Sequence, residues 1–380
     1  MTALLHDVIA QRRPVGWANL DDFDLGSAVP TPASIVIDQP GWTLYGLDHA
    51  RDLAVFTDLP PGTDLADSPF AYATQHRLAR RVLTMPLADV EAVADLAPPV
   101  PRVILIFSIG RCGSTLLSHA LNTVPGVWCL SEPDAFSTLI LQHYHSPRRS
   151  GFADDQVIRL IRACTRLQFR PPPDRQATVF AMKFRSQALF QADLIHRALP
   201  KADCVFLYRD ALGWSNSVYS MMRQYNFPDT LTGPDRALAW SIFTAAADPA
   251  PLTDVIDLAA PEVPMELALA PAWSCNMAEY TRHLSAGVPF LALRYNEFNR
   301  DREASIARLL RHCGLPESHA AAALRAFERD SQSGTHLSRE ETTHRLSADR
   351  LDRLAALMTR LPAFFDPDLI LPDAISSRPA

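Results

Sequence analysis

Residues 103–121 read VILIFSIGRCGSTLLSHAL, and this stretch decides the fold. It begins with an unbroken apolar run, which is typical of a strand buried on both faces of a parallel sheet. A short turn with Gly110 and Gly113 follows, and the next apolar residues recur at helical spacing. A strand, a glycine turn and a helix in this order direct backbone N–H groups and the positive end of a helix dipole at the turn. The stretch therefore favours a bound anion.

The chain beyond this stretch alternates apolar runs with helical patterns, as parallel sheets with crossover helices do. The sequence predicts an α/β protein with a P-loop-like, three-layer α/β/α core around a central parallel sheet of about four or five strands. Further strands are expected at 127–130, 178–182, 204–208 and 289–293. Helices are expected at 188–199, 212–223, 272–285 and 303–313.

The first hundred residues have a different texture and contain no recognisable chemical motif. Strands are expected at 33–38, 41–48 and 52–59, and helices at 69–83 and 87–96. The proline-rich residues 97–101 cannot continue a helix and are interpreted as a linker. The predicted organisation is therefore a small N-terminal α+β extension over residues 1–100, followed by an α/β domain over 101–380.

The composition limits the class of protein. The net charge of -6 argues against a nucleic-acid partner, because nucleic-acid-binding surfaces are strongly basic. No run reaches the roughly 18 apolar residues of a membrane span, and the N-terminal apolar run is too short for a signal peptide. Six widely spaced cysteines lack metal-ligand spacing. These features predict a cytoplasmic protein with reduced thiols and without a metal ion, and they leave a homodimer open.

The glycine turn departs from the loop of nucleoside triphosphatases. Ser114 and Thr115 provide hydroxyl donors, and Arg111 provides a charged one. The Walker A pattern places a lysine directly before the Ser or Thr, where this chain has Gly113. A tight turn without a ligand stays open as the alternative.

A second motif is CVFLYRDALGWSNSVYSMMRQ, residues 204–224. The predicted strand delivers Arg209 and Asp210 at its carboxyl end, where open α/β sheets bind ligands. Ser217 follows Arg209 by eight residues on the predicted helix. An anion site at Arg209 and Ser217 is one interpretation, and a purely structural Arg209–Asp210 pair is the other.

Together these motifs resemble those of PAPS-dependent sulfotransferases over about residues 102–361. That family opens its core with a [KR]-x-G-[ST]-[ST] loop, which holds the 5′-phosphosulfate of the donor PAPS. The residues of this chain that match the loop are Arg111, Cys112, Gly113, Ser114 and Thr115. The resemblance further implies that Arg209 and Ser217 bind the 3′-phosphate. It implies PAPS as donor, PAP as product and a hydroxyl-bearing acceptor that the sequence does not identify.

Two residues are predicted to carry the chemistry. Glu132 lies 21 residues beyond Arg111, and Lys183 lies 26 residues before Arg209. Both spacings resemble those of protein-tyrosine sulfotransferases, which implies that Glu132 is the general base and that Lys183 and Arg111 stabilise charge on the leaving oxygen. The chain has only two lysines, so one at a strand end is notable. The alternatives are that Glu132 caps a helix and that Lys183 is a surface lysine.

Three further segments are weaker candidates. Residues 294–297 resemble a family strand end that ties the sheet together. The loop at 330–339, with Ser333 and Gly334, lies where family members close over the donor nucleotide. The polar stretch 143–149 is a candidate acceptor contact.

Three functions remain in competition. The first is metal-independent, in-line sulfuryl transfer from PAPS with Glu132 as base. The second is a P-loop kinase or nucleoside triphosphatase, and the third is a nucleotide-binding module without catalysis.

Overall fold

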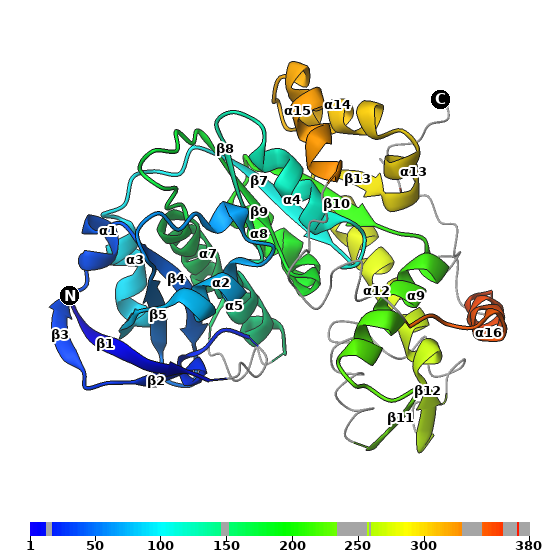
Figure 1. Ribbon diagram of the computed structural model, residues 1–380, viewed down its shortest axis with the longest axis horizontal. Coiled ribbons are helices and arrows are strands. Elements are labelled where there is room, and N and C mark those ends of the chain that lie inside the picture. The colour runs from blue at the N-terminus through cyan, green and yellow to red at the C-terminus, as the bar shows by residue number, and fades with distance from the viewer. Residues whose placement is uncertain are drawn as a thin grey trace. The chain divides into compact units, whose positions relative to one another are not determined.

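The computed structural model describes residues 1–12, 17–145, 152–233, 257, 260–328, 344–359 and 371 (Figure 1). The chain divides into two compact units. The first unit comprises residues 1–106 and 117–203, and the second comprises residues 107–116 and 204–380. Each unit is described by itself, and the domain boundary expected at residue 100 stays a prediction.

A five-stranded parallel sheet confirms the predicted α/β class. Its strands have the order β13-β10-β7-β9-β8. They are β7 (Arg102–Ser108), β8 (Val127–Ser131), β9 (Val179–Lys183), β10 (Asp203–Tyr208) and β13 (Phe290–Arg294). Residues 104–107 of β7 are fully buried, as expected for a strand covered on both faces. All five strands lie within one or two residues of their predicted positions.

A separate six-stranded antiparallel sheet is formed by the N-terminal residues of the first unit. The order is β2-β1-β6-β5-β4, with β3 also paired to β1. The strands are β1 (Thr2–Gln11), β2 (Phe23–Leu25), β3 (Val29–Pro32), β4 (Trp42–Asp48), β5 (Leu53–Asp58) and β6 (Arg81–Pro86). The expected strands at 41–48 and 52–59 are thus confirmed as β4 and β5.

Two local predictions in this region are wrong. Residues 33–38, expected as a strand, contain the short helix α1 (Ile35–Asp38). The backbone carbonyl of Ile37, near the end of this helix, accepts a hydrogen bond from Arg170 at 2.7 Å. The β-branched residues there favour a strand only where a neighbouring strand offers pairing. The helix expected over 69–83 ends early, because α2 spans Ala71–Leu78 and β6 follows. Pairing of β6 with both β1 and β5 overrides the helical pattern.

Helices of the first unit flank its strands. The longer ones are α5 (Asp134–His145) and α7 (Asp154–Gln168), which pack against β4 (Figure 1). The others include α3 (Val90–Ala94), within the helix expected at 87–96, and α8 (Ala192–Ala198), preceded by the 3₁₀ turn η4 (Ser186–Gln191). The helix α4 (Ser114–Asn122) begins in the second unit and continues into the first.

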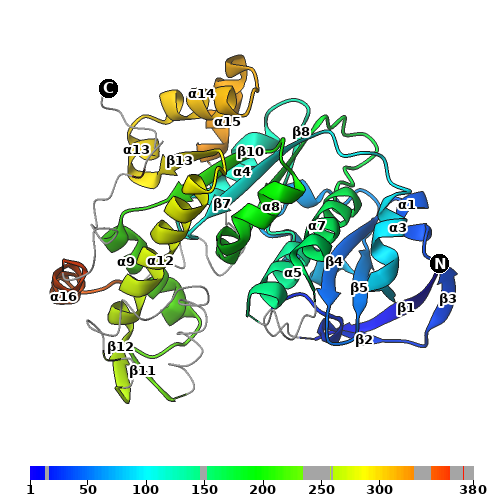
Figure 2. The same cartoon turned by 180° about the vertical axis from the view of Figure 1, so that it is seen from behind.

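The second unit is mostly helical around β10 and β13. Helices α9 (Ala211–Gln224) and α12 (Met265–Ser285) pack together (Figure 2). Other elements of this unit include β11 (Thr230–Thr232), β12 (Glu262–Pro264), α13 (Tyr295–Arg300), α14 (Arg302–His312), α15 (Ala320–Arg325) and α16 (Ala348–Met358). The predicted helix at 272–285 is longer than expected and includes Pro271. No helix in the described part of the chain is long and apolar enough to cross a membrane.

Candidate active site

The glycine turn after β7 has the predicted strand–loop–helix geometry. Gly110, Arg111 and Gly113 all adopt the left-handed backbone region, with φ of 71°, 52° and 84°. For a non-glycine residue this region costs roughly 1–2 kcal/mol, and such strain clusters at functional sites. Ser114 is buried, and its Oγ lies 3.1 Å from Ser108 Oγ. Trp214 braces the turn from α9, because its Nε1 donates to the carbonyl of Gly110 at 3.1 Å.

The surroundings of Gly113 leave little room for a side chain at the position where the Walker A pattern has a lysine. A Cβ at this position would lie 3.1 Å from Cε2 of Tyr295, the residue that begins α13. The positive φ adds a second obstacle to any side chain. The loop therefore favours glycine at the position where a nucleoside triphosphatase has its lysine.

The structure brings Arg111, Arg209 and Ser217 together within the second unit. Arg111 Nε donates to Ser217 Oγ at 3.1 Å, which joins the loop to α9. Burial lowers the pKa of Arg111, and the nearby charge of Arg209 lowers it further. Two guanidinium groups held close enough to repel each other form an environment that an anion would stabilise.

Arg209 is held by its surroundings at the end of β10. Its guanidinium lies 4.8 Å from the centroid of the Tyr295 ring, and its carbonyl accepts from Trp273 Nε1 at 2.8 Å. Asp210 caps α9 by accepting from the backbone N–H of Gly213 at 2.7 Å. Arg209 Nε lies 3.9 Å from Asp210 Oδ2, beyond hydrogen-bond distance, so Asp210 acts mainly as a helix cap. Tyr295, interpreted from the sequence as part of the sheet framework, thus lies against both Gly113 and Arg209.

Two other predicted loop residues point away from the surface. Cys112 is buried, and its thiol donates to the carbonyl of Leu207 at 3.4 Å. Thr115 is also buried at the start of α4. Their contribution to a ligand would therefore come chiefly through the backbone of the turn and the Thr115 hydroxyl.

Glu132 and Lys183 form an ion pair in the first unit. Lys183 Nζ donates to Glu132 Oε1, and the backbone N–H of Glu132 donates to the carbonyl of Lys183 at 2.6 Å. The Lys183 side chain is 4% exposed, which excludes an ordinary surface lysine. Glu132 follows β8 with a φ of 55°, a second non-glycine residue in the left-handed region. A residue with a strained backbone whose carboxylate pairs with a buried lysine is typical of a functional site.

Sequence reasoning missed a second ion pair beside the first. Asp134 is fully buried, and Arg185 Nε lies 2.7 Å from its Oδ1. The same Nε lies 3.8 Å from Glu132 Oε2, so Arg185 faces both acids. Burial raises the pKa of Asp134, although the Arg185 charge opposes that shift. The only signal in the sequence was the arginine two residues beyond Lys183, at a strand end.

Some of the predicted site residues lie outside the part of the chain that the structure describes. Ser333 and Gly334, with the loop at 330–339, lie outside the described residues, as do the side chains of 143–149. Among residues with described positions, no group of three His, Cys, Asp or Glu side chains is arranged to hold a metal ion. Transfer without a metal ion stays a prediction.

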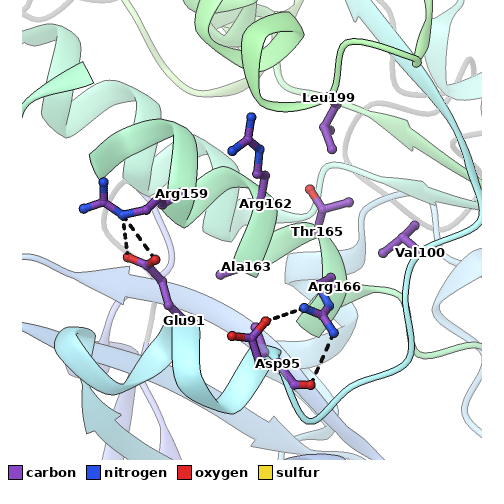
Figure 3. Close-up of a pocket in the computed structure, with 10 residues that line it drawn as sticks. Glu91, Asp95, Val100, Arg159, Arg162, Ala163, Thr165, Arg166 and Leu199 are labelled. Carbon is purple, nitrogen blue, oxygen red and sulfur yellow. Dashed lines mark hydrogen bonds and ion pairs between the residues drawn. The ribbon is translucent and has the colours of Figure 1, made fainter. Parts of the chain in front are cut away.

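A hollow of about 370 Å³ lies elsewhere in the first unit, between α3 and α7 (Figure 3). Arg159 pairs with Glu91 at 3.2 Å, and Arg166 pairs with Asp95 at 2.5 Å (Figure 3). Arg162 donates to a carbonyl at the end of α8 at 2.9 Å. The arginines of this hollow thus serve local structure, and none of the predicted site residues lines it.

No protein-family model and no curated protein sequence matches this chain. Solved structures with a similar fold include a sulfotransferase from Alicyclobacillus acidocaldarius, 16% identical over 71% of this chain and 97% of that one, with a TM-score of 0.40. A sulfotransferase from Mycobacterium avium is 12% identical over 75% of this chain and 80% of that one, with a TM-score of 0.39. A mouse sulfotransferase in complex with PAP is 11% identical over 74% of this chain and 92% of that one, with a TM-score of 0.37. Likenesses this weak carry no argument, so the proposed function rests on the residues of this chain.

Proposed function

We propose that this chain is a sulfotransferase that moves a sulfuryl group from PAPS to a hydroxyl acceptor. The observation that carries the proposal is the convergence of Arg111, Arg209 and Ser217 around the glycine turn. Two like charges held together by the fold are costly unless an anion lies between them. PAPS carries anionic groups at its 5′ and 3′ ends and would use both arginines.

The binding roles follow from the chemistry of each group. The turn from Gly110 to Thr115 offers backbone N–H groups and hydroxyls, which suit the oxygens of the 5′-phosphosulfate. Arg209 and Ser217 offer a guanidinium and a hydroxyl, which suit the 3′-phosphate. The bare backbone at Gly113 lets an oxyanion approach the turn closely.

The transfer itself needs a base, a nucleophile and a stabilised leaving group. The acceptor oxygen forms a bond to sulfur while the bond between sulfur and the bridging phosphate oxygen breaks. PAP leaves with the electron pair, and Glu132 takes the acceptor proton. Lys183 and Arg111 stabilise the negative charge that develops on the bridging oxygen. The Glu132–Lys183 ion pair supports this assignment, because the two groups lie next to each other.

The proposal is tested by calorimetric titration of the purified chain with PAP, without magnesium, and with ATP as the comparison. We expect PAP to bind and ATP not to bind. Arg209→Ala should weaken PAP binding by about 10- to 100-fold, since a hydrogen bond to a charged group contributes roughly 1.5–3 kcal/mol. Arg311→Ala is the matched control, because Arg311 is exposed in the same unit and pairs with Glu317.

The other outcomes separate the competing functions. Magnesium-dependent ATP turnover without PAP binding would contradict the proposal in favour of a nucleoside triphosphatase. PAP binding without sulfuryl transfer from PAPS to water or to any phenol, primary alcohol or tyrosine peptide tested would indicate a binding module. PAP binding with sulfate release would support the proposal and justify a screen of phenols, primary alcohols and tyrosine peptides as acceptors.

A further inference from the structure

Glu132, the proposed base, has a cation near each of its carboxylate oxygens. Lys183 donates to Oε1 of Glu132, and Arg185 Nε lies 3.8 Å from Oε2. At 3.8 Å the Arg185 approach is an ion pair without a hydrogen bond, and its charge attraction favours the orientation in which Oε2 faces the guanidinium. Arg185 therefore limits the directions in which Glu132 can accept a proton.

Arg185 is itself fixed by a buried acid. Its Nη2 donates to Asp134 Oδ2 at 3.0 Å, and its Nε lies 2.7 Å from Asp134 Oδ1. Asp134 is fully buried, so this pair is shielded from water. One hydrogen bond at Nη2 and the charge attraction at Nε hold the planar guanidinium, an arrangement that a lysine ammonium does not reproduce.

The first hundred residues hold this buried pair in place. The backbone N–H of Ala18 donates to Asp134 Oδ2 at 2.8 Å. The ring of Tyr72, in α2, lies 4.0 Å from the Arg185 guanidinium carbon, a close cation–π contact. Phe70, just before α2, lies 5.8 Å from Lys183 Nζ. Ala18, Phe70 and Tyr72 all precede residues 102–361, the stretch that resembles sulfotransferases.

The segment that carries the two rings is anchored at each end. Before the rings, Asp64 accepts from Trp128 Nε1 at 2.9 Å and from Arg175 at 2.7 Å. After them, the fully buried Gln75 donates to the carbonyl of Leu44 at 2.9 Å. Phe70 and Tyr72 are therefore positioned by contacts to β8 and β4.

We propose that Arg185 is a positioning residue for Glu132 and that the first hundred residues serve the catalytic centre by holding Arg185 through Asp134 and Tyr72. The inference rests on the proposed role of Glu132 as the base. Its consequence is selective: loss of the Arg185 contact misdirects the base and leaves donor binding intact. A misplacement of about 1 Å can cost roughly 100-fold in rate.

The test removes the whole buried pair, because removal of one partner alone leaves an uncompensated buried charge and destabilises the fold. The double variant Asp134→Asn/Arg185→Met removes both charges of the pair, so neither is left without its partner, and it keeps similar volumes. The matched control is Asp48→Asn/Arg51→Met, which removes another pair with a buried acid in the same unit. The assay follows PAP formed from PAPS with water, phenols, primary alcohols and tyrosine peptides as acceptors, and PAP affinity is measured in parallel.

We expect the double variant to lose at least tenfold in kcat with KM for PAPS and PAP affinity within about twofold of the control variant. Arg185→Lys should fall between the double variant and the wild type, since it keeps the charge and loses the fork. Equal kcat in the double variant and the control variant would overturn the inference while the proposed function stands. A wild-type chain that does not bind PAP would overturn both.

Tyr72 tests the part played by the N-terminal residues. Tyr72→Phe keeps the ring face and should keep kcat. Tyr72→Leu removes it and should lower kcat by about three- to tenfold at unchanged KM for PAPS. Wild-type kcat in Tyr72→Leu would contradict the role assigned to the first hundred residues.

Discussion

The charged group around Arg111 and the charged group around Glu132 differ in how their charges are balanced. Arg111 and Arg209 repel each other, which lowers the pKa of Arg111 beyond the effect of burial. Glu132, Asp134, Lys183 and Arg185 neutralise one another in two ion pairs. The first arrangement is suited to an anionic ligand that arrives from solution. The second is complete without a ligand and is suited to orienting a base.

This contrast predicts very different losses of stability when one arginine is removed from each group. Arg185→Met should lower the free energy of unfolding by about 3–5 kcal/mol, because it leaves the fully buried Asp134 without its partner. Arg111→Met relieves a repulsion and should leave the stability of the ligand-free chain nearly unchanged. Urea denaturation measures both. A large loss in Arg111→Met would break the comparison.

The next largest effect is expected on turnover. Lys183→Ala should reduce sulfate release from PAPS by about 100- to 1,000-fold, as loss of one preorganised donor does in other enzymes. PAP affinity should stay within about twofold, since Lys183 acts on charge that develops only in transfer. Steady-state kinetics and calorimetry separate the two quantities. Unchanged turnover would remove Lys183 from the mechanism.

Gly113 gives a sharper test of the anion site. Gly113→Ala should weaken PAP binding by about tenfold, which corresponds to about 1.4 kcal/mol, because the new Cβ displaces Tyr295 from beneath Arg209. Gly62→Ala is the matched control, since Gly62 has a similar φ of 80° and open space around it. Both variants should lose similar backbone stability. Equal PAP affinity in the two variants would show that the Tyr295 contact does not matter.

The smallest expected effect concerns Tyr295 itself. Tyr295→Leu removes the ring beneath Arg209 and should weaken PAP binding by about two- to fivefold, as expected from a cation–π contribution of about 0.5–1 kcal/mol. Tyr295→Phe keeps the ring face and should bind PAP like the wild type. Calorimetry distinguishes the two. A larger loss in Tyr295→Phe than in Tyr295→Leu would contradict a role for the ring.

Local sequence was enough to predict the parallel sheet and the residues of the glycine turn. Buried parallel strands are continuous apolar runs, and their carboxyl ends are marked by polar residues such as Arg209 and Glu132. The N-terminal sheet was harder, because β6 and α1 take their form from distant pairing partners. Pattern reasoning sees only near neighbours in the chain, so such contacts escape it.

The sequence by itself determined the fold class, the turn that favours an anion and the candidate base with its lysine. Only the tertiary structure decided that Lys183 is buried against Glu132, that Tyr295 lies between Gly113 and Arg209, and that Arg185 joins two acids. The physical reason is that strands and turns follow from short-range periodicity and backbone preference, which are written locally. Charge pairing depends on which side chains meet in space, and Ala18 meets Asp134 across 116 residues of chain.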